Sequence, residues 1–257
     1  MPLPLEQLLI GALAAFIIGF SKTGVPGLGI LAIPVIAALF PGRASLGATL
    51  PLLLAGDVLA LLLYRRNAHW PTLARLAPSV LIGFGVGITA FLVLNSQPSA
   101  RDQIGVIIGW MVLLMVGLHL LRLRFPDLLA PHTALGTHLA GTLAGFATLI
   151  SNAAGPIMQI YMSGLRLEKR AFMGSSAWFY FIFNALKIPI YLALTALAPD
   201  QPFFTAAGLT FCLALVPVVG IGGAAGRWAL GRLPQRAFTL IVLVLSAAAA
   251  LKLILGI

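Results

Sequence analysis

Three charged side chains stand inside stretches of the chain that are otherwise apolar: Lys22, Asp57 and Lys187. Placing one charged group at the centre of a lipid bilayer costs at least about 2.5–3.5 kcal/mol, so such a residue usually has a functional role or a partner. Two ammonium groups and one carboxylate leave a net positive charge when all three are ionised. This balance favours the binding of a small anion and makes Asp57 a candidate proton-coupling residue.

Two short strings of polar and helix-breaking residues interrupt long apolar stretches in matching places, SKTGVP at 21–26 and SNAAGP at 151–156. The proline in each string suits the first turn of a following helix, where free backbone N–H groups attract anions. Asn184 precedes Lys187 by three residues, which places both on one helix face. We therefore predict a substrate-binding site formed by Lys22, Thr23, Ser21, Gly24, Ser151, Asn152, Asn184, Lys187 and Gln159.

Each main candidate also has a structural interpretation. The long side chains of Lys22 and Lys187 can extend to a membrane interface, which would make both lysines anchors. Asp57 would then serve only to neutralise a lysine. Ser151 and Asn152 are residue types that cap helix ends. Because both interpretations fit the same sequence pattern, only the contacts of these residues can separate them.

The composition indicates which elements must position these residues. Of the 257 residues, 60% are hydrophobic and only 9% are charged, so the bilayer is the expected solvent of the chain. The net charge of +10 comes from basic residues spread over short loops, which indicates membrane topology and no binding of nucleic acid. A single cysteine and isolated histidines predict no metal site, no cofactor and no catalytic centre.

Apolar segments divide into long spans and short pairs. A helix needs about 20 residues to cross a bilayer, and six segments reach that length: 44–64, 72–95, 99–121, 171–196, 203–228 and 234–256. Two pairs of shorter segments flank the interrupting strings, 5–20 with 27–40 and 135–150 with 156–164. We predict an all-α integral membrane protein in which each short pair forms a broken or re-entrant hairpin.

The two halves of the chain resemble each other. Ser21 and Pro26 correspond to Ser151 and Pro156 at an offset of 130 (151 − 21), and further along Asp57 corresponds to Asn184. This similarity predicts two repeats, each with one hairpin and three transmembrane helices. The predicted N-terminal repeat, 1–124, contains hairpin 5–40 and spans 44–64, 72–95 and 99–121; the C-terminal repeat, 135–257, contains hairpin 135–164 and spans 171–196, 203–228 and 234–256.

Lysine and arginine residues in the loops predict the orientation of the chain. Loops 65–75, 122–134, 165–170 and 227–236 carry most of them and are expected in the cytoplasm, with the N-terminus outside. Corresponding loops of the two repeats then lie on opposite sides, so the repeat has inverted topology. Inverted repeats with interrupted segments are typical of secondary transporters that bind substrate near the bilayer midplane. We expect a multi-pass protein of the cell inner membrane.

The pattern also resembles a known family, the sulfite exporter TauE/SafE family. The resemblance is carried by Gly19, Gly24, Gly27 and Gly29 before Ile33-Pro34, by residues 43–49 leading to Asp57, and by SNAAGP, Gly174-Ser175-Ser176 and Asn184-Ala185-Leu186-Lys187 before Tyr191. The first break has fewer consecutive glycines than is usual in the family. The resemblance implies export of small sulfur-containing anions such as sulfite and organosulfonates, linked to protons or another gradient.

These observations predict a secondary active transporter of a small anion that works by alternating access, with protons as coupling ion. A passive anion channel fits the same sequence. An intramembrane enzyme with Ser151 as nucleophile is disfavoured, because no G-x-S-x-G motif is present and no suitable base is near in sequence. The sequence is compatible with a homo-oligomer.

Overall fold

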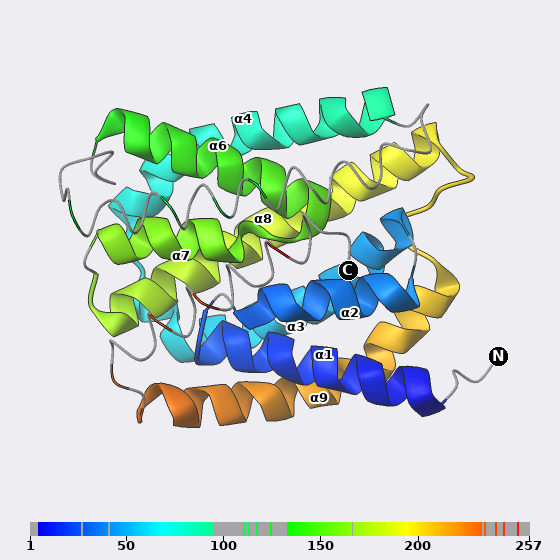
Figure 1. The fold of residues 1–257 in the computed structure, drawn as a ribbon, viewed down its shortest axis with the longest axis horizontal. Coiled ribbons are helices and arrows are strands. Elements are labelled where there is room, and N and C mark those ends of the chain that lie inside the picture. Colours follow the sequence, from blue (N-terminus) through cyan, green and yellow to red (C-terminus); the bar gives the residue numbers. More distant parts are fainter. Residues whose placement is uncertain are drawn as a thin grey trace. The chain divides into compact units, whose positions relative to one another are not determined.

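A computed structural model describes residues 5–26, 28–40, 42–94, 133–165, 167–232 and 234, with seven isolated positions between 110 and 251. Within these residues the chain is helical and contains no strand. The predicted spans 99–121 and 234–256 lie outside the described residues, apart from isolated positions. The elements are α1 (Leu5–Thr23), η1 (Leu28–Leu31), α2 (Ala32–Leu39), α3 (Arg43–Tyr64), η2 (Arg65–Asn67), α4 (Trp70–Leu94), α6 (Ala134–Ser151), α7 (Ala154–Gly164), α8 (Lys169–Leu197) and α9 (Ala206–Leu230) (Figure 1).

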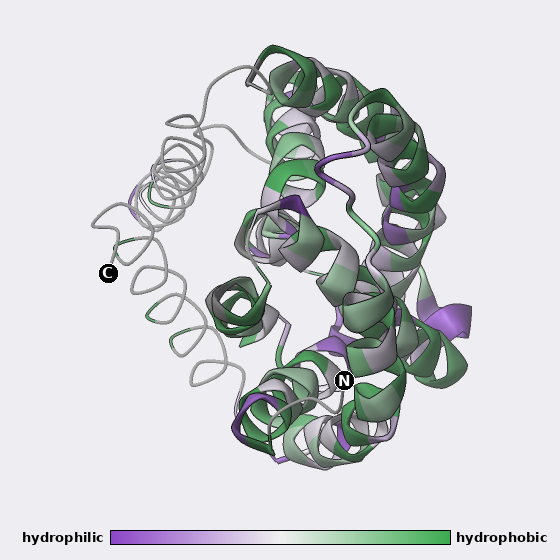
Figure 2. Cartoon of the chain, turned by 90° about the vertical axis from the view of Figure 1, so that its right-hand side faces the viewer, coloured by the Kyte–Doolittle hydropathy of each residue, from purple (hydrophilic) through white to green (hydrophobic). Residues whose placement is uncertain are grey.

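Six of these helices are long and apolar enough to cross a membrane: α1, α3, α4, α6, α8 and α9. Hydrophobic residues predominate along the described helices (Figure 2), and many large apolar side chains remain exposed, Leu62 and Leu213 among them. Such a surface is stable only in lipid. An all-helical membrane protein is therefore confirmed, and the predicted spans 44–64, 72–95, 171–196 and 203–228 are found with ends shifted by a few residues.

Both predicted hairpins are present. α1 packs against η1 and α2, and α6 packs against α7. The second arm is short in each case, because α2 has 8 residues and α7 has 11. The first arm is longer than predicted, since α1 has 19 residues and α6 has 18. At about 1.5 Å per residue, both first arms are long enough to cross the hydrocarbon core.

The chain divides into two compact units. The first unit comprises Met1–Arg66 and Ser176–Pro234, and the second comprises Asn67–Ser175 and Gln235–Ile257. Each unit thus combines segments from both halves of the sequence, and α8 contributes to both. The predicted repeats, 1–124 and 135–257, describe internal similarity rather than compact units, and they stay a prediction.

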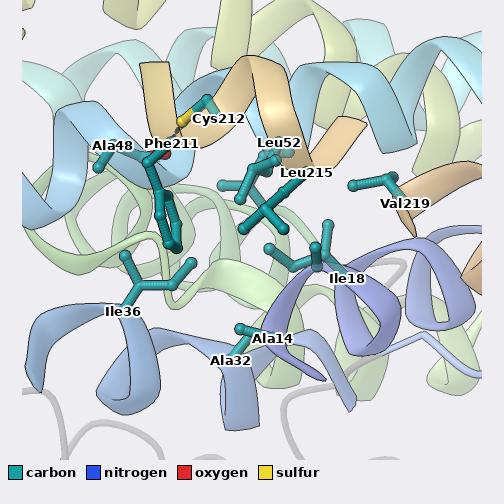
Figure 3. Packing of buried hydrophobic residues seen from close by; sticks show 12 residues of the cluster. Ala14, Ile18, Ala32, Ile36, Ala48, Leu52, Phe211, Cys212, Leu215 and Val219 are labelled. Atoms are coloured by element: carbon teal, nitrogen blue, oxygen red, sulfur yellow. Dashed lines mark hydrogen bonds between the residues drawn. The ribbon is translucent and has the colours of Figure 1, made fainter. Parts of the chain in front are cut away.

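In the first unit, α1 and α9 lie side by side at very short range (Figure 1). A Cβ atom at Gly19 would overlap the carbonyl of Val219, and one at Gly222 would overlap the carbonyl of Phe16. Glycine at these positions is what lets the two backbones approach each other, as in other membrane helix pairs. Side chains from α1, α2, α3 and α9, including Ile18, complete the apolar core beside this contact (Figure 3).

The second unit repeats this kind of contact between α4 and α6 (Figure 1). A Cβ atom at Gly83 would overlap the carbonyl of Thr142, and one at Gly145 would overlap the carbonyl of Val80. Close to this contact, the buried Ser79 hydroxyl lies 2.6 Å from Nδ1 of His138. Both units therefore use glycines to bring together one hairpin arm and one long helix.

Candidate functional site

The first half of the first interrupting string forms the end of α1, and its second half, residues 24–26, forms the break. Ser21, Lys22 and Thr23 lie in the last turn of the helix, so the prediction that the helix ends near residue 20 was wrong. These three residue types tolerate a helix, and the N–H group of Gly24 still bonds to the carbonyl of Phe20 at 2.9 Å. The helix ends only where Gly24 and Pro26 follow, because glycine favours irregular backbone and proline restricts the residue before it.

Two hydroxyl groups of the string stabilise the backbone around the break. The Thr23 hydroxyl donates to the carbonyl of Gly223 on α9 at 2.6 Å. The Ser21 hydroxyl accepts from the N–H group of Gly29 at 2.9 Å, which fixes the start of η1. The carbonyl of Thr23, freed by the helix end, accepts from the Tyr64 hydroxyl at 2.8 Å. These contacts hold the end of α1 in place and so position Lys22.

Lys22 and Asp57 form a buried ion pair. Nζ of Lys22 lies 2.6 Å from Oδ1 of Asp57, and the two side chains are 11% and 0% exposed. Asp57 stands seven residues before Tyr64, the last residue of α3, whose hydroxyl binds the end of α1. The Lys22 side chain therefore extends back from the helix end into the unit, as the Cα–Cβ direction in a helix favours. It does not extend to an interface, which was the structural alternative for this residue.

Asn184 completes the contacts of the carboxylate. Its side-chain N–H group donates to Oδ2 of Asp57 at 2.6 Å, and the amide is 2% exposed. Each oxygen of Asp57 thus faces one partner, Lys22 from α1 and Asn184 from α8. Hydrogen bonds to a charged, desolvated carboxylate are stronger than bonds between neutral groups. The sequence placed Asp57 and Asn184 at corresponding positions of two repeats, and here they bind each other directly.

One face of α8 presents polar groups to this ion pair. Tyr180, Asn184 and Lys187 are spaced four and three residues apart, so they lie along a single stripe of the helix. Nζ of Lys22 lies 4.0 Å from the ring centroid of Tyr180, a cation–π contact. Lys187 is fully buried on the same stripe, one turn beyond Asn184. We refer to these five residues as the charge cluster.

Tyr180 is not among the residues that the sequence predicts for the site. The signal was present, because Tyr180 precedes Asn184 by one helical turn. A tyrosine ring in an apolar helix is usually a packing residue, so spacing alone could not separate the two roles. The contact with Lys22 comes from α1, more than 150 positions away (180 − 22).

The other candidates lie in the second unit. The Ser151 hydroxyl donates to the carbonyl of Ala147 at 3.0 Å, as serines near helix ends often do. Asn152 caps α6 in the left-handed conformation with φ 59°, a role that asparagine tolerates well. Gln159 on α7 is 4% exposed, and its side-chain oxygen has no hydrogen-bond partner. A substrate role for these three residues stays a prediction.

The charge cluster has the chemistry of an anion site. Two lysines and one carboxylate carry a net charge of +1 when all are ionised, and the burial of Asp57 and Lys187 leaves this charge only partly screened. A net positive charge in a desolvated place costs free energy, and a bound anion would lower that cost. Among the described residues, no group of three or more His, Cys, Asp or Glu side chains could hold a metal ion.

These features define a multi-pass membrane protein built around a buried cluster of charges. The family model "Sulfite exporter TauE/SafE" matches residues 10–253, nearly the whole chain, and the protein belongs to this family. The resemblance found in the sequence is thereby confirmed. Family membership makes the chain a membrane transporter of sulfite or related anions, and not an enzyme. Comparison with curated proteins and with solved structures found no match.

Proposed function

We propose that this protein is a secondary active transporter of a small sulfur-containing anion, sulfite or an organosulfonate, and that the charge cluster binds the anion. The observation that carries the proposal is the ion pair of Lys22 and Asp57 with fully buried Lys187 beside it. A transporter must replace the hydration shell of its anion, and ammonium groups in a desolvated site do this most effectively.

Lys22 and Lys187 would hold the anion between α1 and α8. Lys22 is the better candidate for first contact, because its side chain is 11% exposed whereas Asp57 and Lys187 are fully buried. Ser21, Thr23 and Gly24 would contribute to substrate binding indirectly, because they stabilise the backbone that positions Lys22. The polar side chains of Ser151, Asn152 and Gln159, and the N-terminus of α7, would contribute further donors to the substrate path.

Asp57 would couple transport to protons. A carboxylate beside Lys22 competes with the substrate for the ammonium group and repels the anion. A proton on Asp57 removes both effects, so proton binding and anion binding favour each other. Among the described residues, the groups that act on Asp57 are Lys22 from α1 and Asn184 and Lys187 from α8, while α9 has no charged residue before Arg227. Asp57 is thus the single acidic group of the cluster.

Alternating access by an inverted repeat would move the site between the two sides of the membrane. Residues that correspond in the two halves make corresponding contacts. Gly222 lies against Phe16 in the first unit, and Gly83 lies against Phe146 in the second. The direct bond between Asp57 and Asn184 also fits a pseudo-two-fold axis that passes between α3 and α8. Export across the inner membrane, with the N-terminus outside, completes the proposal.

Transport in proteoliposomes tests this assignment. We expect Lys22→Ala and Lys187→Ala to abolish anion flux while the purified proteins remain folded in detergent. Lys169→Ala, at the exposed start of α8, is the matched control and should transport normally. Normal flux in both cluster variants would remove the lysines from the site. For Asp57→Asn, flux that stays fully dependent on a proton gradient would remove Asp57 from the coupling role.

A passive anion channel is the second candidate, because a positive buried cluster also selects anions in a pore. The two mechanisms differ in thermodynamics. A transporter should accumulate a labelled dianionic substrate against its own gradient when a proton gradient is imposed, and flux should saturate with substrate concentration. Flux that never runs uphill would favour the channel.

A further inference from the structure

We infer that Asp57 selects the charge of the transported anion, so that a monoanion binds alone and a dianion binds together with one proton. This inference rests on the proposed function, because it concerns the substrate of the same site. It goes further by assigning a specificity to one residue and by predicting how that specificity changes.

The argument is one of charge balance. When Lys22 and Lys187 are both protonated, their two ammonium groups and the carboxylate of Asp57 carry +1 in total. One monoanion neutralises this cluster, whereas a dianion leaves one uncompensated negative charge. Asp57 is 0% exposed and Lys187 is fully buried, so water cannot compensate the excess. A proton that binds to the Asp57 carboxylate on the entry side and leaves on the exit side restores neutrality for the dianion.

Because Asn184 and Asp57 are bonded to each other and have similar side chains, substitutions at these two positions can change the net charge of the cluster without changing its shape. The amide of Asn184 and the carboxylate of Asp57 have the same planar outline and lie 2.6 Å apart. Asp57→Asn removes one negative charge with almost no change in volume, and Asn184→Asp adds one. The double variant exchanges the two groups and keeps the net charge of the wild type. No other residues of the cluster need to be altered.

Isethionate and sulfoacetate are suitable probes, because both are small sulfonates and their charges at neutral pH are −1 and −2. Sulfite itself is unsuitable, since it changes charge near neutral pH. The quantity to measure is the affinity for isethionate divided by the affinity for sulfoacetate, from inhibition of flux in proteoliposomes and from thermal shifts of the purified protein at constant pH. Thermal shifts also report whether each variant is folded.

We expect the wild type to prefer isethionate by about tenfold, the scale that one unbalanced unit charge produces at a partly screened site. Asp57→Asn should reverse the preference toward sulfoacetate, and Asn184→Asp should weaken both ligands. The exchange variant Asp57→Asn/Asn184→Asp should restore the preference for isethionate. Sulfoacetate flux, but not isethionate flux, should carry one proton in the wild type.

The outcomes separate this inference from the proposed function. If the wild type transports sulfite but neither sulfonate, the inference fails alone; if it transports none of the three anions, the proposed function fails as well. If the wild type transports both but Asp57→Asn leaves the affinity ratio unchanged, only the charge selection is overturned. The same holds if the folded exchange variant keeps the reversed preference of Asp57→Asn, because geometry and not net charge would then determine selectivity.

Discussion

The two compact units share their mode of packing but differ in charge. In both, glycines let a first hairpin arm touch a long helix, α1 against α9 and α6 against α4. Among the described residues, the first unit buries Asp57 and Lys187 completely, whereas every buried polar residue of the second unit is uncharged. The comparison indicates that the two units share glycine-mediated helix packing, whereas buried charge distinguishes the first unit and is the reason for proposing the site there.

The largest effect is expected where a charge loses its partner. Asp57→Leu leaves Lys22 buried beside Lys187, and we expect the free energy of unfolding to fall by about 3–5 kcal/mol. In the second unit, Ser79→Ala removes only the bond between neutral Ser79 and exposed His138, which should cost about 1 kcal/mol. SDS-induced unfolding of the purified variants, followed by tryptophan fluorescence, measures both.

The double variant Lys22→Met/Asp57→Leu serves as the control for this prediction. It removes the ion pair as a whole and should recover part of the lost stability, because Lys22 is no longer left without its partner, whereas buried Lys187 still lacks the carboxylate. If Asp57→Leu and Ser79→Ala lowered the free energy of unfolding equally, the view that charge distinguishes the two units would be contradicted.

The glycine contacts should respond alike in both units. Gly19→Ala and Gly145→Ala place a methyl group against backbone atoms that cannot move aside, and we expect each to cost about 2 kcal/mol. Gly220→Ala and Gly85→Ala are matched controls on α9 and α4, since nothing lies within 4 Å of a Cβ atom there. Both controls should be neutral or stabilised by up to about 1 kcal/mol through helix propensity. If the alanine variants of Gly19 and Gly145 lost clearly different amounts of stability, the two units would not share the same kind of helix packing.

The sequence could predict the class of fold and the charged members of the site. Apolar length predicts the long helices, and the cost of burying charge singles out Lys22, Asp57 and Lys187. It could not predict where α1 ends, because Ser21, Lys22 and Thr23 tolerate a helix and only Gly24 and Pro26 stop it. Nor could it predict the contact of Tyr180 with Lys22, which depends on how α1 and α8 pack and not on local spacing.

A smaller effect is expected at Tyr180. Tyr180→Leu removes the ring beside the Lys22 ammonium, a contact worth about 1 kcal/mol, and should raise KM for anion flux by about fivefold. Tyr180→Phe keeps the ring and should change KM by less than about twofold. In the second unit, the Tyr161 hydroxyl lies 3.2 Å from the neutral Thr137 hydroxyl, and Tyr161→Phe should leave KM unchanged. A comparable rise in KM for Tyr180→Phe would mean that the hydroxyl, and not the ring, acts on the site.

The smallest effect concerns the way the two hairpins turn. Asn152 ends α6 with φ 59°, whereas among the described residues near the end of α1 none has a positive φ. Asn152→Gly keeps this conformation available and should change stability by only a few tenths of a kcal/mol, while Asn152→Ala should cost about 1 kcal/mol.

Thermal unfolding and anion flux, measured on the same preparations, separate the two roles of the residue. If Asn152 only caps the helix, the glycine variant transports like the wild type. If its amide also binds substrate, both variants lose flux although only the alanine variant loses stability, and the second unit then contributes a ligand despite having no buried charge in its described part.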